Sequence, residues 1–319
     1  MTMTRTDKGS DCCVPDRPLT KQSRSPMPHS YRQRPKPQPD EDLVALPGSE
    51  FLMGAIDGPH PEDGEGPIRA TFVDTFCISK YAVTNQQYDQ FVAATGYRSL
   101  AEQMEASFVF APRDEFSSSA RRPTHAPWWK LTDRAYWRCP KGKGSTIDDI
   151  ANHPVVHIAQ QDALAYCQWA GMRLPSEAEW EIAARGGLSQ MPFPWGSELL
   201  LNGQSNCHIW SGEFPISHEY MSQPGPVAVN AYQPNGFGLY NMTGNVWERV
   251  ADRFTNLHSP RPARNPRGPL NGRHYVARGG SYLCHHSYCC RYRTSSRQSL
   301  DGQATADNIG FRVAADRSS

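Results

Sequence analysis

Turn-forming residues interrupt this chain so often that no long helix or strand can run through most of it. Its 319 residues include 25 glycines and 27 prolines. Beyond residue 190, turn signals recur along the chain, for example at Asn235-Gly236, Asn271-Gly272 and Gly279-Gly280. Such pairs favour tight turns because glycine adopts backbone conformations that other residues avoid. With no repeat of fixed period and no heptad pattern, the sequence predicts a compact α+β domain of low regular secondary structure.

Three stretches carry helix signals. Each begins at a residue whose side chain can accept a backbone hydrogen bond, and each ends at a glycine. The predicted helices start at Thr84, Asp162 and Ser176 and stop at Gly96, Gly171 and Gly186. Thr84 and Ser176 are each followed three residues later by Gln or Glu, which is the capping-box pattern.

Short apolar runs predict strands at residues 51–54, 71–73 and 76–78, and a buried strand at residues 153–158. Between residues 98 and 152, aromatic side chains alternate with Pro, Gly and Ser without sustained periodicity. A long irregular connection of this kind is uncommon unless it forms a binding surface.

The ends of the chain differ in composition from its middle. Residues 1–42 contain seven prolines and almost no large apolar residue, so they cannot bury enough surface to offset their conformational entropy. We expect a disordered N-terminal tail over 1–42, one catalytic domain over 43–316 and a short C-terminal tail over 317–319.

Charge and cysteine content limit the possible partners. The net charge is +1 and the isoelectric point is about 7.6, so no strong field attracts nucleic acid or a membrane surface. The sequence shows no apolar run of membrane-spanning length and no secretory signal. Nine cysteines in such a chain indicate reduced thiols or metal ligands. We expect a cytoplasmic monomer without nucleic-acid or membrane partners.

Residues 278–293 concentrate the chemistry. This segment holds three cysteines, two histidines, three tyrosines and three arginines. A structural zinc site needs four ligands, and no partner pair is evident elsewhere, whereas two thiolates suit Cu(I). A pair of buried structural thiols is the alternative, and Cys290 is a spare. The isolated cysteines are expected to be small buried hydrophobes: Cys77, Cys139, Cys167 and Cys207.

Motifs along the chain resemble those of the formylglycine-generating enzymes, copper-dependent oxidases that convert a sulfatase cysteine to formylglycine. The resemblance covers residues 43–316 and rests on motifs at 46–54, 81–85, 126–129, 153–157, 173–181 and 234–241. These motifs specify a wider superfamily with a fold related to C-type lectins. The signature at 279–293 is narrower and indicates the oxidase.

The resemblance implies roles for individual residues. It implies that Cys284 and Cys289 bind Cu(I), and that Ser281, Tyr288 and Trp247 line the oxygen and substrate pocket. A substrate peptide with a proline and an arginine is expected to bind in a groove formed by Glu102, Trp128 and Trp129. Asn308 falls on a family position near the oxygen and substrate pocket. The resemblance also implies a Ca²⁺ site built from Asn241, Gly244, Val246 and Glu248. A second family calcium site is expected to be weakened or absent, because His208 replaces an Asn.

The implied activity is oxidation of the cysteine in an unfolded Cys-x-Pro-x-Arg segment of a sulfatase, with O2 and a thiol reductant. The alternative is a non-catalytic peptide- or sulfatase-binding module of the same fold. A sulfoxide synthase is disfavoured, because residues 1–42 cannot supply its separate helical domain. Residues 13–17, Cys-Val-Pro-Asp-Arg, themselves match the substrate pattern. Chance in a Pro- and Arg-rich segment is one explanation, and a tethered pseudosubstrate or self-modified cysteine is the other.

Overall fold

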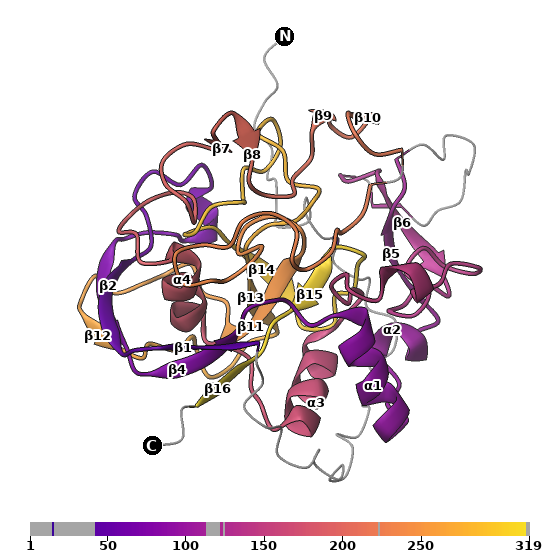
Figure 1. The fold of residues 1–319 in the computed structure, drawn as a ribbon, viewed down its shortest axis with the longest axis horizontal. Coiled ribbons are helices and arrows are strands. Elements are labelled where there is room, and N and C mark those ends of the chain that lie inside the picture. Colours follow the sequence, from indigo (N-terminus) through magenta and orange to yellow (C-terminus); the bar gives the residue numbers. More distant parts are fainter. Residues whose placement is uncertain (1–14, 16–41, 113–121, 124, 223, 317–319) are drawn as a thin grey trace.

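The computed structural model describes residues 15, 42–112, 122–123, 125–222 and 224–316. Within these ranges the chain forms four α-helices, two 3-10 turns and sixteen short strands (Figure 1). The helices are α1 (Asn85–Thr95), α2 (Leu100–Gln103), α3 (Gln160–Ala170) and α4 (Glu177–Arg185), and the 3-10 turns are η2 (Pro61–Asp63) and η3 (Asp148–Ile150). This mixture of short elements confirms the predicted α+β fold of low regular structure.

A four-stranded sheet near the centre of the molecule positions the candidate site (Figure 1). Its strands lie in the order β14 (Arg297–Asp301), β13 (His274–Arg278), β11 (Trp247–Arg253) and β15 (Ile309–Phe311). β13 runs antiparallel to β14 and β11, whereas β15 runs parallel to β11. The starts of β11, β14 and β15 and the end of β13 therefore meet at one edge. The loop 279–296 leaves and re-enters the sheet at that edge.

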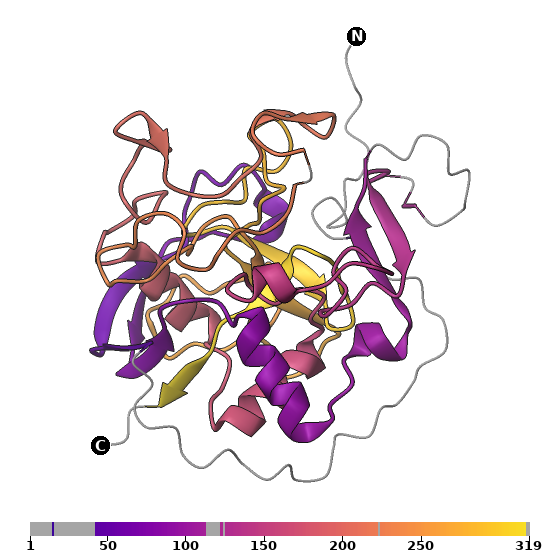
Figure 2. The ribbon, with the colours of Figure 1, turned by 45° about the vertical axis from the view of Figure 1, so that its right-hand side comes forward.

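Smaller sheets surround the central one, and Figures 1 and 2 place β5 and β6 on the opposite side of the molecule from β1, β2 and β4. The three-stranded sheets contain β1 (Leu43–Leu46), β4 (Phe76–Ser79) and β16 (Ala314–Asp316), and β12 (Ala263–Arg264), β3 (Arg69–Val73) and β2 (Ser49–Met53). The two-stranded sheets pair β5 (Ala106–Phe110) with β6 (Trp129–Asp133), β7 (Leu200–Leu201) with β8 (Gln204–Ser205), and β9 (Gly212–Glu213) with β10 (Ser217–His218). β2, β3 and β4 confirm the strands predicted in the first part of the chain.

The predicted capping signals set two helix starts. Thr84 Oγ1 accepts a hydrogen bond from Gln87 N at 3.2 Å, and the Gln87 side chain accepts one from Thr84 N at 2.9 Å. Ser176 and Glu179 form the same reciprocal pair at α4. The helices α1, α3 and α4 end, as predicted, at glycines in the left-handed conformation: Gly96, Gly171 and Gly186.

The prediction that Asp162 is the N-cap residue of its helix is wrong by three residues. α3 begins at Gln160 with Ala159 at the N-cap, and Asp162 Oδ2 accepts from Ala159 N at 2.9 Å. Its other oxygen accepts from the Tyr97 hydroxyl at 2.8 Å and from Leu100 N at 3.0 Å. Burial raises the pKa of Asp162 to about 6 despite these donors. Alanine has no side-chain oxygen that could accept a capping hydrogen bond. The only carboxylate of this cap therefore belongs to Asp162, three residues after the N-cap residue Ala159.

The strand predicted at residues 153–158 does not form, although the segment is buried from residue 154 onward. Pro154 makes an isolated bridge with Thr84, and Val155 N donates to Val83 O at 2.8 Å. His157 has a φ of 64°, in the left-handed region, and this ends the extended pairing. Proline also removes a backbone donor from the segment. The apolar pattern therefore predicted burial correctly and pairing incorrectly.

The stretch from 98 to 152, which lacks any periodic signal, contains regular structure. It holds the short helix α2 and the antiparallel pair β5 and β6, with Phe110 opposite Trp129. Eighteen residues separate the end of β5 from the start of β6, so no local turn signal links the two strands. Both strands contribute aromatic side chains to the hydrophobic cluster around the candidate site.

The predicted N-terminal tail lies outside the described residues, except for Pro15 and Asp42, and so do residues 317–319. The backbone N of Lys80 donates to Asp42 O at 2.7 Å, and β1 begins at Leu43, where the composition changes. Pro15 is buried. Within the described ranges no helix is both long and apolar enough to cross a bilayer, since the longest have eleven residues.

His157 is expected to make the fold sensitive to acid. It is fully buried, with Nδ1 2.7 Å from Ser107 Oγ and Nε2 2.9 Å from Pro140 O. Burial lowers the pKa of His157 to about 4. The unfolded chain, with a histidine pKa near 6.5, therefore takes up the proton first, and stability falls as the pH drops from about 6.5 towards 4.

We expect this histidine to account for a loss of about 2 kcal/mol in the free energy of unfolding between pH 7.5 and pH 5. Urea titrations at both pH values measure the loss, and a His157→Gln variant should show that much less dependence on pH. A substitution of the exposed His125 serves as control. An unchanged pH dependence in His157→Gln would contradict the prediction.

Candidate active site

The thiol pair lies in the loop 279–296, which begins with a double-glycine turn. Gly279 and Gly280 have φ values of 92° and 75°. A Cβ atom on Gly280 would approach Arg291 O to 2.5 Å and Cys284 Sγ to 3.2 Å. Glycine is therefore required at this position, because the returning half of the loop passes directly against the segment that carries Cys284.

Cys284 and Cys289 are both buried, with 1% of their surfaces exposed, and belong to one hydrophobic cluster. The Ser281 N–H points to Cys284 Sγ at 3.4 Å, and Cys284 N donates to Ser281 O at 2.9 Å. The chain then makes a tight turn from His285 to Cys289, which is closed by a hydrogen bond from Cys289 N to His285 O at 3.0 Å. A backbone N–H directed at sulfur favours the thiolate form that metals and electrophiles need.

Three further predicted residues meet at the same place. Asn308 Nδ2 donates to Ser281 Oγ at 3.1 Å, and Trp247 N donates to Asn308 O at 2.8 Å. All three side chains are fully buried. The parallel pairing of β15 with β11 explains this contact, since it places Asn308, the residue before β15, beside the first residue of β11. The structure thus brings Ser281, Trp247 and Asn308 together with Cys284.

Tyr288 belongs to an aromatic cluster at the rim of the site, which we define as Trp128, Phe214 and Tyr288. The Tyr288 ring stacks on Phe214 with centroids 4.8 Å apart and meets the edge of Trp128 at 5.0 Å. All three rings are partly buried and pack on the hydrophobic cluster that contains both cysteines. The neighbouring Trp129 is fully buried. Trp128 and Tyr288 therefore lie together, and Phe214 is a member that the sequence analysis missed.

Acidic residues from the segment 60–65 hold the outside of the loop. Arg291 Nε donates to Asp63 Oδ2 at 2.5 Å, and Arg293 pairs with Glu65. The Ser295 hydroxyl donates to Glu65 Oε2 at 2.8 Å. These ion pairs are largely buried, so they fix the loop more firmly than exposed pairs would.

A second ionic layer supports the edge of the sheet below the loop. Arg278 and Arg297 lie opposite each other in β13 and β14, and α4 supplies two buried carboxylates to them. Arg278 Nη2 donates to Glu181 Oε2 at 2.6 Å, and Arg297 Nε donates to Glu177 Oε1 at 2.6 Å. Burial opposes ionisation of Glu177, yet Arg297 and Arg278 lower its pKa to about 2. The carboxylates therefore remain charged and keep both strand ends in place.

Cys290 differs from Cys284 and Cys289 in its surroundings. It has a φ of 48° and is only half-buried, and its thiol donates to His286 O at 3.1 Å. The four isolated cysteines also lie away from the loop's thiol pair in sequence. Burial raises the pKa of Cys167 and Cys207, the latter to about 12, so neither is an activated thiol.

The donor set at the loop fits Cu(I). Two buried sulfur ligands five residues apart offer soft donors in a site that excludes water. In the described part of the chain, no group of three or more His, Cys, Asp or Glu side chains is arranged to hold a metal ion. A four-ligand zinc site is therefore not formed by the described residues.

The predicted calcium ligands do not present a calcium site. The Glu248 carboxylate is buried in a two-oxygen ion pair, with Arg312 Nε at 2.6 Å and Nη2 at 2.7 Å, and also accepts from Trp180 Nε1 at 2.6 Å. Asn241 Oδ1 has no partner among the described residues, whereas Asn241 Nδ2 donates to Val229 O. Calcium takes about six to eight oxygen ligands from carboxylates, carbonyls and water. With its carboxylate neutralised by Arg312, the set of Asn241, Gly244, Val246 and Glu248 does not fit the ion.

The structure does not bring Glu102 to the aromatic cluster. Its Oε2 accepts from Ser99 N at 2.8 Å in the capping box of α2, and from Trp137 Nε1 at 3.2 Å. Trp137 belongs to the hydrophobic cluster around α1 and α3 and not to the one around the thiols. The contacts of Glu102 are thus structural ones, and the prediction that it binds peptide gains no support from them.

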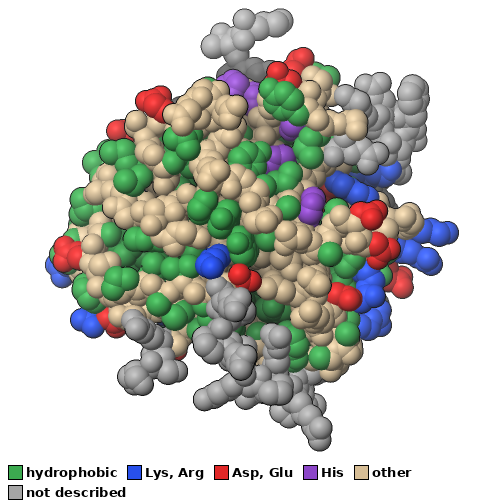
Figure 3. Space-filling model, in the orientation of Figure 1, with side chains coloured by type: hydrophobic (Ala, Val, Ile, Leu, Met, Phe, Trp, Pro, Cys, Tyr) green, Lys and Arg blue, Asp and Glu red, His purple; other side chains and the backbone are tan. Residues whose placement is uncertain are grey.

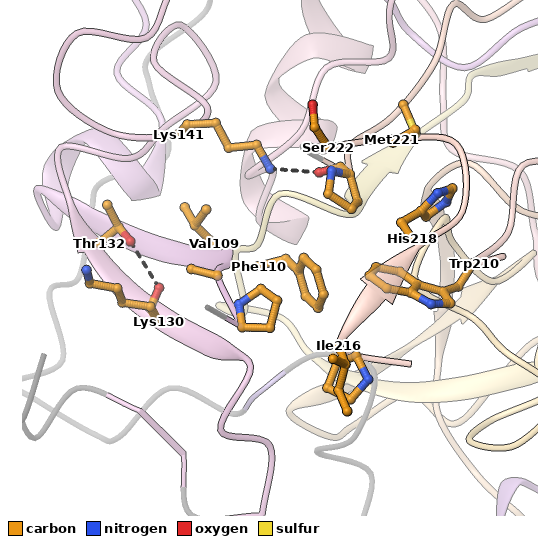
Figure 4. A pocket seen from close by; sticks show the side chains of 14 residues that line it. Val109, Phe110, Lys130, Thr132, Lys141, Trp210, Ile216, His218, Met221 and Ser222 are labelled. Carbon is orange, nitrogen blue, oxygen red and sulfur yellow. Dashed lines mark hydrogen bonds between the residues drawn. The ribbon is translucent and has the colours of Figure 1, made fainter. Parts of the chain in front are cut away.

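Two cavities adjoin the site. One of about 330 Å³ lies beside Phe110 and Trp210, with Lys130 and Lys141 on one side and His218 on the other (Figure 4). Trp210 links it to the segment that carries Cys284, because the backbone N–H of Trp210 donates to the backbone carbonyl of Cys284 at 3.0 Å. The other has a volume of about 880 Å³, and four histidines are among the residues that line it: His208, His218, His285 and His286. Figure 3 shows histidines gathered between hydrophobic patches on this face.

These features define a class of protein: an irregular α+β domain with a buried pair of cysteines packed against an aromatic rim. The chain belongs to the sulfatase-modifying factor family, since residues 29–317 match the model of the "Sulfatase-modifying factor enzyme 1-like domain". The sequence resemblance to the formylglycine-generating enzymes is thereby confirmed.

Named relatives span most of this chain. A protein of Thermomonospora curvata named formylglycine-generating enzyme is 47% identical over 304 residues, which cover 91% of this chain and 99% of that protein. A mouse protein of the same name is 44% identical, with 88% and 77% covered. A cattle protein named inactive C-alpha-formylglycine-generating enzyme 2 is 38% identical, with 86% and 87% covered.

A solved structure supports the fold alone. The structure of PvdO from Pseudomonas aeruginosa superposes with a TM-score of 0.62 at 24% identity, covering 86% of this chain and 94% of that one. At this level of identity the likeness concerns the arrangement of elements and not the chemistry of the site.

Proposed function

We propose that this protein is a copper-dependent oxidase that converts the cysteine of a Cys-x-Pro-x-Arg segment in sulfatases to Cα-formylglycine. The observation that carries the proposal is the buried pair Cys284 and Cys289 below the aromatic cluster. Its relatives named formylglycine-generating enzyme, at up to 47% identity, support the same reaction.

The overall reaction balances with one O2 and two thiols of a reductant. The substrate's Cβ–SH group gives up two electrons and two hydrogens and becomes a thioaldehyde, and the reductant supplies two more electrons as its thiols form a disulfide. Together these reduce O2 to two molecules of water. Hydrolysis of the thioaldehyde then releases hydrogen sulfide and leaves the aldehyde. When bound, Cu(I) supplies activation of O2 and a position for the substrate sulfur.

The chain's own residues hold the peptide against the reacting atoms. Trp128, Phe214 and Tyr288 offer partly exposed ring faces and edges against which the proline of the substrate can pack. Asn308 Nδ2 holds the Ser281 hydroxyl, and the backbone N–H of the same serine points to the Cys284 sulfur. This arrangement keeps the Cβ atom of the substrate in one orientation and excludes bulk water from the thiols.

A reducing cellular environment suits this chemistry. Five of the described cysteines are thiols and not disulfides: Cys77, Cys139, Cys167, Cys207 and Cys290. A cytoplasmic monomer supplied with a small thiol reductant is consistent with these thiols. Calcium has no part in this proposal, because its predicted ligands do not fit.

The test uses purified full-length protein loaded with copper and a synthetic peptide carrying Cys-x-Pro-x-Arg, in oxygenated buffer with a thiol reductant. Mass spectrometry and capture of the aldehyde by hydroxylamine are expected to show conversion, and anaerobic or copper-free samples should show none. The proposal is falsified if the peptide binds and stays unchanged under the complete conditions. Binding without conversion would instead favour the non-catalytic module, as in the relative named inactive.

Ser281→Ala is expected to lower kcat by about 100-fold, the scale of losing one polar contact at a reacting centre, with little change in KM. The reason is that Ser281 is fully buried beside Cys284, and the aromatic rim carries the contacts with the peptide. The matched control is Ser287→Ala, since Ser287 lies in the same loop and its hydroxyl hydrogen-bonds to the His285 ring. Equal kcat values for Ser281→Ala and the parent would overturn this assignment.

A further inference from the structure

Asp307 is a buried carboxylate that directly precedes a residue of the candidate site. Its side chain is 1% exposed, and the following residue, Asn308, donates to Ser281 Oγ at 3.1 Å. Asp307 itself has no part in the reaction proposed above. Burial of a charged side chain is costly unless the charge is paired and hydrogen-bonded, so the partners of this carboxylate indicate what it stabilises.

Asp307 attaches the strand β5 to this part of the site. Asp307 N donates to Phe108 O at 3.1 Å, and Asp307 Oδ2 accepts from Phe110 N at 3.1 Å. The Phe110 ring in turn packs against Phe214 of the aromatic cluster, with centroids 6.3 Å apart. Asp307 therefore connects the strand behind the aromatic cluster to the backbone that carries Asn308.

Lys141 compensates the charge of Asp307 from the surface. Lys141 Nζ lies 2.8 Å from Asp307 Oδ2, and the lysine side chain is 38% exposed. The same ammonium group donates to Pro224 O at 3.3 Å, at the wall of the cavity of about 330 Å³ (Figure 4). Removing one partner of such a pair leaves a buried charge without compensation. Loss of Lys141 is therefore expected to disturb Asp307 and the residues that it holds.

We propose that Asp307 is a positioning residue that holds Asn308 against Ser281 in the reacting geometry. Lys141 acts as its counter-ion. The backbone of Asn308 is then fixed from two sides, because Asp307 attaches to β5 and Trp247 N donates to Asn308 O at 2.8 Å. Small displacements of a group beside a reacting centre lower the rate strongly. The effect on turnover rests on the proposed function, whereas the effect on the mobility of Asn308 does not.

The test compares Lys141→Met, which removes the cation, with Lys141→Arg, which preserves it. The matched control is Lys143→Met, since Lys143 is an exposed lysine two positions further along the same loop. Asp307→Asn is a second variant of the pair. Its amide keeps an oxygen that can accept from Phe110 N but loses the negative charge.

The first readout is hydrogen–deuterium exchange of the Trp247 amide in the copper-free, full-length protein, because this amide donates to Asn308 O. The second is conversion of a Cys-x-Pro-x-Arg peptide by the copper-loaded protein. We expect Lys141→Met and Asp307→Asn to exchange about tenfold faster at Trp247. Their kcat should fall about 10- to 100-fold, with KM changed less than about twofold because the aromatic cluster is retained. Lys141→Arg and Lys143→Met should match the parent in both readouts.

Exchange and turnover like those of the parent in Lys141→Met would overturn this inference. Faster exchange without a change in kcat would also overturn it, because the ion pair would then be structural only. A rise in KM alone would mean that Lys141 contacts the peptide directly, and a loss in Lys141→Arg as large as in Lys141→Met would mean that the charge is not what matters; both contradict the positioning role. If the parent converts no peptide, the proposed function fails, while exchange at Trp247 still decides whether the ion pair holds Asn308.

Discussion

Replacing Cys284 with serine is expected to abolish conversion of a Cys-x-Pro-x-Arg peptide and to reduce the affinity for Cu(I) by several orders of magnitude. Serine preserves the size of the side chain, but its hard oxygen is a poor ligand for a soft ion. The site offers no compensating ligand group of three or more metal-binding side chains among the described residues. Cys289→Ser should behave in the same way, since both sulfurs are buried in one cluster.

The experiment has two readouts, which are the rate of aldehyde formation and copper retention against a chromophoric Cu(I) chelator. Cys290→Ser is the matched control because Cys290 is adjacent in sequence yet half-buried and turned towards His286 O. It should retain both copper and turnover. A fully active Cys289→Ser variant together with an inactive Cys290→Ser variant would transfer the second ligand role to Cys290.

Replacing Glu248 with glutamine is expected to lower the free energy of unfolding by about 3–5 kcal/mol, because it leaves Arg312 buried without its counter-charge. Arg312 is fully buried and donates two hydrogen bonds to this carboxylate and three to backbone oxygens nearby. Urea titration measures the loss. Addition of calcium or of a calcium chelator should change neither the parent nor the variant.

The matched control for this substitution is Asp89→Asn. Asp89 pairs with Arg138 on the surface, where both side chains are more than 40% exposed, so its loss should cost less than about 1 kcal/mol. If calcium stabilises the parent but not Glu248→Gln, the calcium site implied by the family resemblance exists after all, and the ion pair with Arg312 is not its permanent state.

Local signals predicted much of this structure. Capping boxes and terminal glycines located α1 and α4 because a helix end depends on residues within four positions. The loop 279–296 was conspicuous by its composition alone. Contacts that depend on strand pairing are harder to predict from sequence. Only the family resemblance pointed to Asn308, and the parallel pairing of β15 with β11 explains why this residue lies beside Ser281.

Other features had no local signal. Phe214 joins the aromatic rim from the turn between β9 and β10, and nothing in its neighbourhood marks it as a partner of Tyr288. The acidic residues Asp63 and Glu65 reach the loop from more than 220 positions away. Glu102 illustrates the reverse error, since the Ser99-x-x-Glu102 spacing was itself a capping signal. The sequence also does not show that Arg312 pairs with the Glu248 carboxylate, which the calcium prediction assigns to the ion.

The convergence of strand ends at one edge of the central sheet has a consequence for the order in which the protein matures. The site is assembled from residues 60–65, residue 247, the loop 279–296 and residue 308, and β15 must pair with β11 to complete it. A nascent chain lacks the last of these pieces until residue 308 and β15 have been synthesised. Under the proposed function, copper would meet the complete site only after β15 has paired with β11.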